Sequence, residues 1–197
     1  FSSVPWAKYV DPIRGKKCRI FSFEMKKVSN IDISITQRKN LPNLNFLRKF
    51  DLIVSYGLRK KIPSSYIKLF RGKMINLHIS YLPYNKGAHP NFWSWVKNTP
   101  KGVSIHLISE KIDAGDIIFQ KKINFPNKNI TFRKSYNILR AELEDLFIRN
   151  FYKILSRSYT PKKQKKNGSI NFKKNLPNNF NSWDIIISEY LKKKNFR

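Results

Sequence analysis

The chain has 197 residues, of which 41% are hydrophobic and 14% aromatic, a composition that suits one domain with a core and excludes a disordered chain. The 40 lysines and arginines face 12 acidic residues, giving a formal net charge of +28. Such an excess indicates a polyanionic partner, although an A/T-rich genome would give the same lysine-rich composition without one. The single cysteine excludes an internal disulfide and favours a cytoplasmic protein. No apolar run is long enough for a membrane-spanning helix.

Apolar runs and alternation predict the elements of the first half of the chain. We expect short strands at 18–23 and 31–35 and a short helix at 41–50. The compact apolar run 51–57 ends in glycine and is typical of a buried parallel strand. A short helix at 66–70 and a strand at 74–78 follow. The chain begins with Phe rather than Met, so we expect its N-terminus, and with it the first strand, to be truncated.

The second half continues the same alternation of strands and helices. We expect a helix over 92–96 with Asn91 as its N-cap, strands at 102–108 and 116–123, and an amphipathic helix at 136–155. This order predicts an α/β fold with a mostly parallel sheet. In such sheets ligands bind beyond the carboxyl ends of the strands.

The composition changes after residue 155. Basic residues outnumber acidic ones over 156–197, and only 184–191 suggests a helix. We therefore expect one domain over 1–155, followed by a solvated basic C-terminal extension over 156–197. Three aromatic side chains of the extension would suit stacking on RNA bases: Phe172, Phe180 and Trp183.

Polar groups gather near the predicted strand ends. Asn76 and His78 are two apart on a strand and therefore point the same way, while Asp113 lies in a tight segment between two strands. An amide donor, an imidazole and a carboxylate suit acyl transfer; a capped turn and a core histidine are the structural alternative. His106 lies on the opposite face from its apolar neighbours, and we expect it to be structural. The histidines lack the helical spacing of metal ligands, so we expect no metal.

The stretches 75–83, 86–90, 102–106 and 112–118 occur in an order and spacing that resemble the N10-formyltetrahydrofolate-dependent formyltransferases. That family includes methionyl-tRNA, glycinamide ribonucleotide and nucleotide-linked amino-sugar N-formyltransferases. The resemblance implies that 1–155 is a Rossmann-like catalytic domain. It also implies direct transfer of a formyl group from N10-formyltetrahydrofolate to an amine, without a covalent enzyme intermediate.

The resemblance also implies the role of individual residues. Asn76 and protonated His78 would stabilise the oxyanion, and Asp113 would hold His78 and help to remove the amine proton. The family's pterin-binding positions fall on Tyr56, Leu58, Arg59, Ile112, Ala114 and Gly115. Its acceptor-binding positions fall on Tyr84, His89, Asn91 and Trp93, although Trp93 also suits the core face of a helix.

The loop and helix over 80–94 are closest to the amino-sugar group, so we expect a nucleotide-linked amino sugar as the acceptor. Too few residues follow 155 for the C-terminal barrel of methionyl-tRNA formyltransferases, and no glycine-rich phosphate loop of the glycinamide ribonucleotide enzymes is visible. Both acceptors remain alternatives. A third alternative is an inactive family member that binds RNA through its basic extension. The oligomeric state is left open, with a homodimer as one option.

Overall fold

The computed structural model describes residues 41–58 and 60–194, and the chain divides into two units after Phe50. The strands expected before residue 40 lie outside the described residues. In the described part of the first unit, helix α2 spans Leu44–Leu47, within the expected range. Asn43 caps this helix by accepting a hydrogen bond from the backbone N–H of Phe46 at 2.8 Å.

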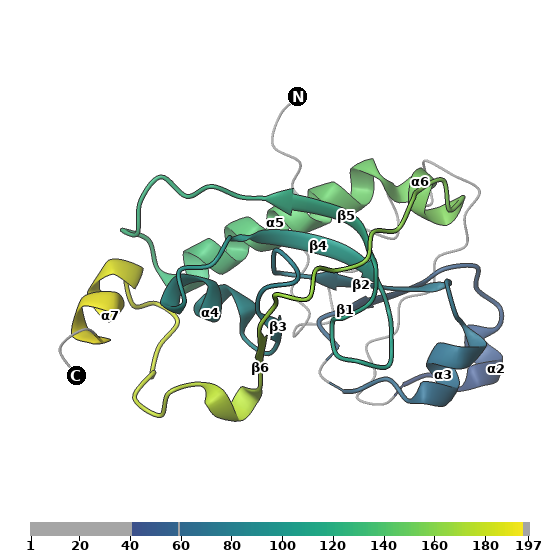
Figure 1. Ribbon diagram of the computed structural model, residues 1–197, viewed down its shortest axis with the longest axis horizontal. Coiled ribbons are helices and arrows are strands. Elements are labelled where there is room, and N and C mark those ends of the chain that lie inside the picture. Colours follow the sequence, from purple (N-terminus) through teal and green to yellow (C-terminus); the bar gives the residue numbers. More distant parts are fainter. Residues whose placement is uncertain (1–40, 59, 195–197) are drawn as a thin grey trace. The chain divides into compact units, whose positions relative to one another are not determined.

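A four-stranded sheet in the order β1-β2-β4-β5 forms the centre of the second unit (Figure 1). Strands β1 and β2 are parallel, whereas β2 and β4, and β4 and β5, are antiparallel. The expected α/β class is confirmed, but the described strands form a mixed sheet rather than a mostly parallel one. For β4 and β5 the reason is the loop between them, which is too short for a crossover connection. The strands are β1 (Ile53–Tyr56), β2 (Met74–His78), β4 (Gly102–Leu107) and β5 (Ile117–Lys122).

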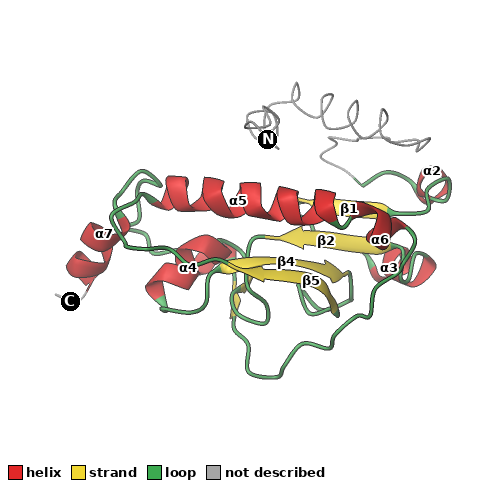
Figure 2. Cartoon of the chain, turned by 90° about the horizontal axis from the view of Figure 1, so that it is seen from above, coloured by secondary structure: helices red, strands yellow, loops and turns green. Residues whose placement is uncertain are grey.

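Helix α5 (Phe132–Arg149) covers one face of the sheet (Figure 2). It begins four residues before the expected start because Thr131 caps it, accepting a hydrogen bond from the N–H of Lys134 at 3.0 Å. Its buried side packs on strand residues that are fully inaccessible, such as Ile75 and Ile105. None of the described helices is long and apolar enough to cross a membrane. The other helices of the second unit's first part are α3 (Ser64–Leu69), α4 (Pro90–Val96) and α6 (Phe151–Leu155).

The chain after α6 crosses the face of the sheet opposite α5 (Figure 2). It belongs to the same unit as the sheet, and its strand β6 (Ile170–Asn171) pairs in parallel with β3 (Lys86–Gly87). Residues 156–194 therefore pair and pack within the unit of the sheet rather than standing apart from it, although most of them are exposed, as expected of a solvated segment. Backbone pairing and aromatic packing hold this segment in place. Neither could be predicted from the sequence, because the segment is rich in exposed lysines. The segment ends with the 3-10 helix η2 (Lys173–Asn175) and helix α7 (Ile187–Lys194).

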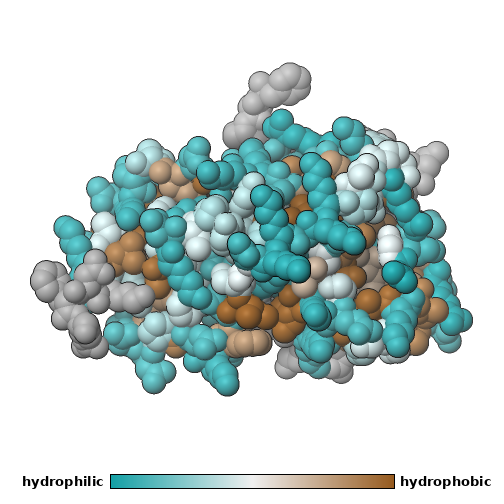
Figure 3. All heavy atoms as spheres, viewed as in Figure 1, coloured by the Kyte–Doolittle hydropathy of each residue, from teal (hydrophilic) through white to brown (hydrophobic). Residues whose placement is uncertain are grey.

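An aromatic cluster joins this C-terminal segment to helices α4 and α5. The ring of Phe180 lies 4.7 Å from that of Phe92 and 5.4 Å from that of Phe132, and Trp183 packs against the same group. Phe180 is therefore a core residue and Trp183 a partly buried ring packed against the core, whereas Phe172 is 47% exposed. Hydrophilic residues cover most of the face seen in Figure 3. The buried members of the cluster are Phe92, Trp93, Trp95, Phe132, Phe180 and Ile187.

The cluster yields a stability prediction. Phe180→Ala removes a ring that is only 9% exposed and should lower the free energy of unfolding by about 3–5 kcal/mol. Phe172→Ala, a matched phenylalanine at an exposed position, should change it by less than about 1 kcal/mol. Chemical denaturation followed by tryptophan fluorescence measures both. Equal losses in the two variants would contradict the packing described.

Candidate active site

Three side chains expected from the sequence to act together meet at one end of β2. Asn76 and His78 project from the same face of this strand, and Asp113 lies in the loop between β4 and β5. The Asn76 amide donates a hydrogen bond to Asp113 Oδ1 at 3.2 Å. His78 Nε2 lies 3.6 Å from Asp113 Oδ2, an ion-pair distance rather than a hydrogen bond. The carboxylate of Asp113 is thus the point at which the three side chains converge.

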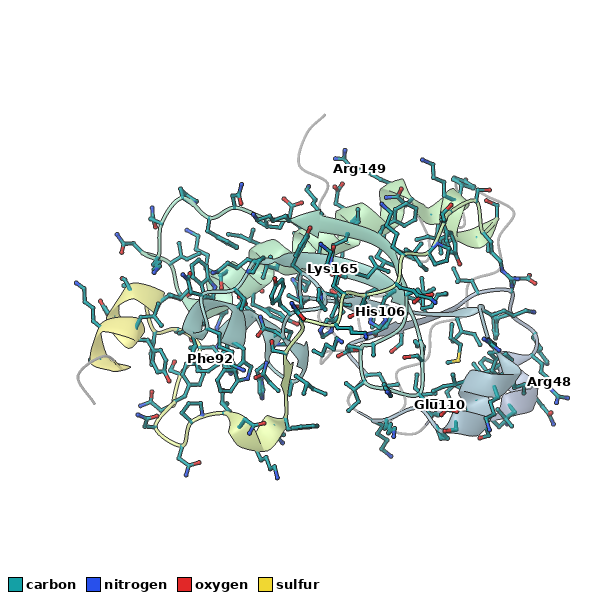
Figure 4. All side chains as sticks on the ribbon, viewed as in Figure 1. Arg48, Phe92, His106, Glu110, Arg149 and Lys165 are labelled. Carbon is teal, nitrogen blue, oxygen red and sulfur yellow. The ribbon has the colours of Figure 1, made fainter. Side chains whose placement is uncertain are left out.

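His106 is a fourth member of this cluster. His106 (labelled in Figure 4) is buried, and it faces Asn76 directly across the antiparallel pair of β2 and β4. Both side chains therefore lie on one face of the sheet. Its Nδ1 donates to the carbonyl of Leu107 at 2.8 Å, which leaves Nε2 to accept from the Asn76 amide at 3.2 Å. His106 Nε2 is also 3.6 Å from Asp113 Oδ1. Alternation along the strand gave the correct face, but the pairing register was needed to find the partner.

A backbone donor, the N–H of Gly87, holds the Asp113 carboxylate in place. The N–H of Gly87 donates to Oδ2 at 2.8 Å, and Gly87 itself has a φ of 83°. A Cβ at this position would lie 2.3 Å from the carbonyl oxygen of Asn171, so only glycine fits. Burial alone raises the pKa of Asp113, but interactions with His78, His106 and the Gly87 N–H outweigh it and hold that pKa well below its usual range. Asp113 is therefore ionised at neutral pH.

Burial is the largest influence on the pKa of His78. Its side chain is nearly inaccessible, and this burial lowers its pKa below the ordinary value, although the charge of Asp113 acts in the opposite direction. Its Nε2 faces two acceptors, Asp113 Oδ2 and, at 3.5 Å, the carbonyl of Asn85, so the hydrogen of the neutral ring resides on Nε2. The site at neutral pH therefore holds an uncharged imidazole beside an ionised carboxylate.

The predicted folate-binding residues separate into two groups. Those in the loop after β4 flank Asp113, and Gly115 packs so closely that a Cβ would lie 1.8 Å from the carbonyl oxygen of Leu107. Leu58 follows β1 and is exposed, and Arg59 lies outside the described residues. The predicted residues of the loop are Ile112, Ala114 and Gly115.

The side chain of Tyr56 points away from Asn76 and His78. Tyr56 pairs with Leu77 in the parallel register of β1 and β2, so its side chain lies on the face opposite to Asn76 and His78. Its hydroxyl donates to Glu144 Oε1 on α5 at 2.7 Å. A contact of Tyr56 with the pterin stays a prediction, and the orientation of the side chain leaves the main chain of Tyr56 as the group that would make it.

The four predicted acceptor-binding residues also divide. Tyr84 and His89 are half-buried in the segment before α4, and the ring of His89 lies 5.3 Å from that of Trp183. Trp93 is almost fully buried, yet its Nε1 has no hydrogen-bond partner in the part of the chain that the structure describes. These three remain candidates for contact with an acceptor.

Asn91 has a structural role instead. It is neither the N-cap of α4 nor accessible: Pro90 occupies the first turn, His89 is the N-cap, and Asn91 is 4% exposed inside the helix. Its amide donates to the carbonyl of Phe132 and the hydroxyl of Ser135, each at 2.9 Å. Both contacts join α4 to the start of α5, so the predicted acceptor contact by Asn91 is not supported.

Glu144, the partner of Tyr56, leads to a prediction about pH. Burial raises its pKa to about 7, whereas an unfolded-state glutamate titrates near 4.5. The folded protein therefore keeps this proton when the unfolded chain has lost it, and the free energy of unfolding should fall as pH rises from about 4.5 to 7, by up to about 3 kcal/mol.

Glu144→Gln removes this titration and serves as the control. Unfolding free energies of the two proteins, measured by chemical denaturation from pH 4 to 8, should diverge in favour of the variant as pH rises. Parallel profiles would show that Glu144 titrates normally in the folded protein.

Comparison with known proteins adds the family. The formyl transferase family model matches residues 22–150. The crystal structure of the formyltransferase PseJ from Anoxybacillus kamchatkensis, in complex with UDP-4,6-dideoxy-4-formamido-L-AltNAc and tetrahydrofolate, is 32% identical with a TM-score of 0.77, and the match covers 89% of this chain and 93% of that one.

Two sequence relatives cover different shares of the chain. The dTDP-4-amino-4,6-dideoxyglucose formyltransferase of Mycobacterium bovis is 29% identical over 130 residues, 66% of this chain and 54% of the relative. The methionyl-tRNA formyltransferase of Clostridium novyi is 27% identical over 203 residues, 90% of this chain and 65% of the relative. The chain thus spans only about half the length of the first of these relatives. Because the family model spans more than half of the chain and the architecture agrees with that of PseJ, the chain belongs to the formyl transferase family.

Proposed function

We propose that this protein transfers the formyl group of N10-formyltetrahydrofolate to the amino group of a nucleotide-linked amino sugar. The observation that carries the proposal is the pairing of neutral His78 with ionised Asp113 at 3.6 Å, beside the amide of Asn76. The likeness to PseJ, which was solved with a UDP-linked formamido sugar and tetrahydrofolate, supports both substrates.

The reaction sets three requirements for the site. The uncharged amine attacks the formyl carbon, the bond from that carbon to N10 breaks, and the amine nitrogen ends in the new amide bond. One proton leaves the amine and one is gained by N10, so no external oxidant or reductant is needed. The site must therefore stabilise a transient oxyanion, accept a proton and return it.

The chain's own residues meet these requirements in the following way. His78, neutral in the resting protein, accepts the proton that the amine loses, and Asp113 stabilises the resulting imidazolium, which then protonates N10. Protonated His78 is thus a state within the reaction, since burial lowers its pKa in the resting protein. The exposed side chain of Ile112, 41% accessible beside Asp113, offers apolar surface to a pterin.

Asn76 serves as the oxyanion donor only after an exchange of partners. Its Nδ2 is shared between Asp113 Oδ1 and His106 Nε2, each at 3.2 Å, so both amide hydrogens already have acceptors. The oxyanion would take the place of one of them as the second substrate reacts. His106 and Asp113 therefore orient the Asn76 amide in the resting protein. Whichever of these two hydrogen bonds remains during the reaction keeps the other N–H directed at the oxyanion.

Contact with RNA through the basic segment is the weaker reading. Two of the three aromatic rings expected to stack on bases, Phe180 and Trp183, pack in or against the core. Exposed lysines such as Lys165 leave electrostatic contact with a polyanion open, and the activity assay includes this outcome.

The proposal predicts which acceptor turns over. N10-formyltetrahydrofolate is incubated with the protein and, in separate reactions, a nucleotide-linked 4-amino sugar, glycinamide ribonucleotide or charged initiator tRNA. We expect formylation of the sugar alone. Turnover only with charged tRNA would overturn the proposed acceptor. No turnover with any amine, together with RNA binding that weakens steeply with salt, would overturn the enzymatic function.

Substitution of the cluster tests the mechanism. Asn76→Ala, His78→Ala and Asp113→Asn should each lower kcat/KM by roughly 10²–10⁴-fold, since they remove the oxyanion donor, the proton carrier and the carboxylate that stabilises the imidazolium, respectively. Arg149→Gln changes an exposed side chain on α5 away from the cluster (Figure 4) and should leave kcat/KM unchanged. Circular dichroism confirms that each variant folds. Near-normal rates in all three cluster variants would rule the site out.

A further inference from the structure

Gln164 contacts the catalytic loop from the C-terminal segment, outside the 22–150 range that the family model matches. Its Nε2 donates to the carbonyl oxygens of Asp113 and Gly115, each at 2.8 Å. These two carbonyls lie on either side of Ala114, so one side-chain amide ties the main chain of the loop at two points. Both hydrogens of that amide are used for this loop.

The segment that carries Gln164 is anchored at both ends. We call residues 162–171 the strap. Near its start, Lys162 forms an antiparallel bridge with Ile117, with two backbone hydrogen bonds of 2.8 Å. At its end, the carbonyl of Asn171 accepts a hydrogen bond from the N–H of Ala88 at 2.8 Å in the pairing of β6 with β3. Figure 1 shows the strap crossing the sheet between these anchors.

The same pairing sets the second contact with the catalytic carboxylate. Gly87 lies in β3 opposite Asn171, and its N–H donates to Asp113 Oδ2 at 2.8 Å. The strap therefore holds Asp113 at two points. Gln164 binds the main-chain carbonyl of Asp113, and Gly87, which pairs with the strap, binds its carboxylate. Asp113 has a φ of 46°, a left-handed conformation that an aspartate adopts at some cost and that the surrounding contacts must maintain.

The side-chain amide of Gln164 does not make the strap more stable than an apolar side chain would. Gln164 Oε1 is buried and has no hydrogen-bond partner among the described residues, so its lost hydration is not replaced. An apolar side chain of similar size would avoid that loss. It would also leave the carbonyls of Asp113 and Gly115 without this donor. The amide of Gln164 therefore serves to hold the loop at Asp113 and Gly115.

We propose that Gln164 is a positioning residue for the catalytic carboxylate, holding the loop at Asp113 and Gly115 so that Asp113 stays within reach of His78 and Asn76. The inference rests on the proposed function for the role of Asp113 in formyl transfer. Without the amide, the strap and the sheet remain, but the loop is held at fewer points and the carboxylate moves relative to its partners.

The test compares Gln164→Met, which removes both donors at similar volume, with Lys165→Met, its exposed neighbour (Figure 4). We expect Gln164→Met to lower kcat about 10–100-fold, as small misplacements of catalytic groups do, with less than about threefold change in the KM of the amine. The acid limb of its rate profile, which reports protonation of His78, should shift to lower pH, because the charge of Asp113 raises the pKa of His78 and a displaced carboxylate does so less. Lys165→Met should match the wild type.

Hydrogen–deuterium exchange supplies a readout that does not depend on turnover. Peptides covering 109–117 should exchange faster in Gln164→Met than in Lys165→Met, while α5 stays equally protected in both. A Gln164→Met protein that equals Lys165→Met in exchange and in kcat overturns the inference. A wild type that is inactive with every acceptor overturns the proposed function instead, and the exchange data still decide whether Gln164 holds the loop. If Gln164→Met does not fold, Gln164→Glu, which keeps the side-chain shape and loses the donors, is measured with the same expectations.

Discussion

An ionised carboxylate that is largely withdrawn from water must be surrounded by hydrogen-bond donors, and Asp113 imposes this requirement on the architecture around it. The Gly87 N–H and the Asn76 amide supply donors at 2.8 and 3.2 Å, and His78 lies at ion-pair distance. These groups come from β2 and β3, whereas Asp113 itself lies in the later loop between β4 and β5. The sheet register and the close approach of Gly87 to β6 follow from the need to bring them together.

The C-terminal segment takes part in this arrangement and is continuous with the core. Phe180 packs with Phe92 in the aromatic cluster, the strap pairs with β3 and β5, and Gln164 reaches the catalytic loop. Packing energy is therefore concentrated at the far end of the segment, while directional hydrogen bonds lie next to the site. This division allows the segment to fix the geometry of Asp113 without placing bulky side chains over the sheet.

The sequence predicts those features of the site that depend on residues close together in the chain, and it does not predict those that depend on strand pairing. Period-two spacing placed Asn76 and His78 on one face, and the structure agrees. The partnership of His106 with Asn76 and the opposite facing of Tyr56 depend on strand register, a long-range property that no single segment encodes. Phe180 stands among polar and basic residues without helical or strand periodicity, a context that predicts a surface ring rather than the core position observed. The long central helix, by contrast, was recognisable because its apolar stripe is local.

The central claim is that this carboxylate-centred cluster transfers a formyl group directly to an amine. The most direct measurement is a single turnover with N10-formyltetrahydrofolate carrying ¹³C in the formyl group and a nucleotide-linked 4-amino sugar, followed by NMR. We predict that the label appears in the amide of the sugar product with the wild type and not with Asp113→Asn. Label released as free formate by the wild type, or equal transfer by both proteins, would contradict the claim.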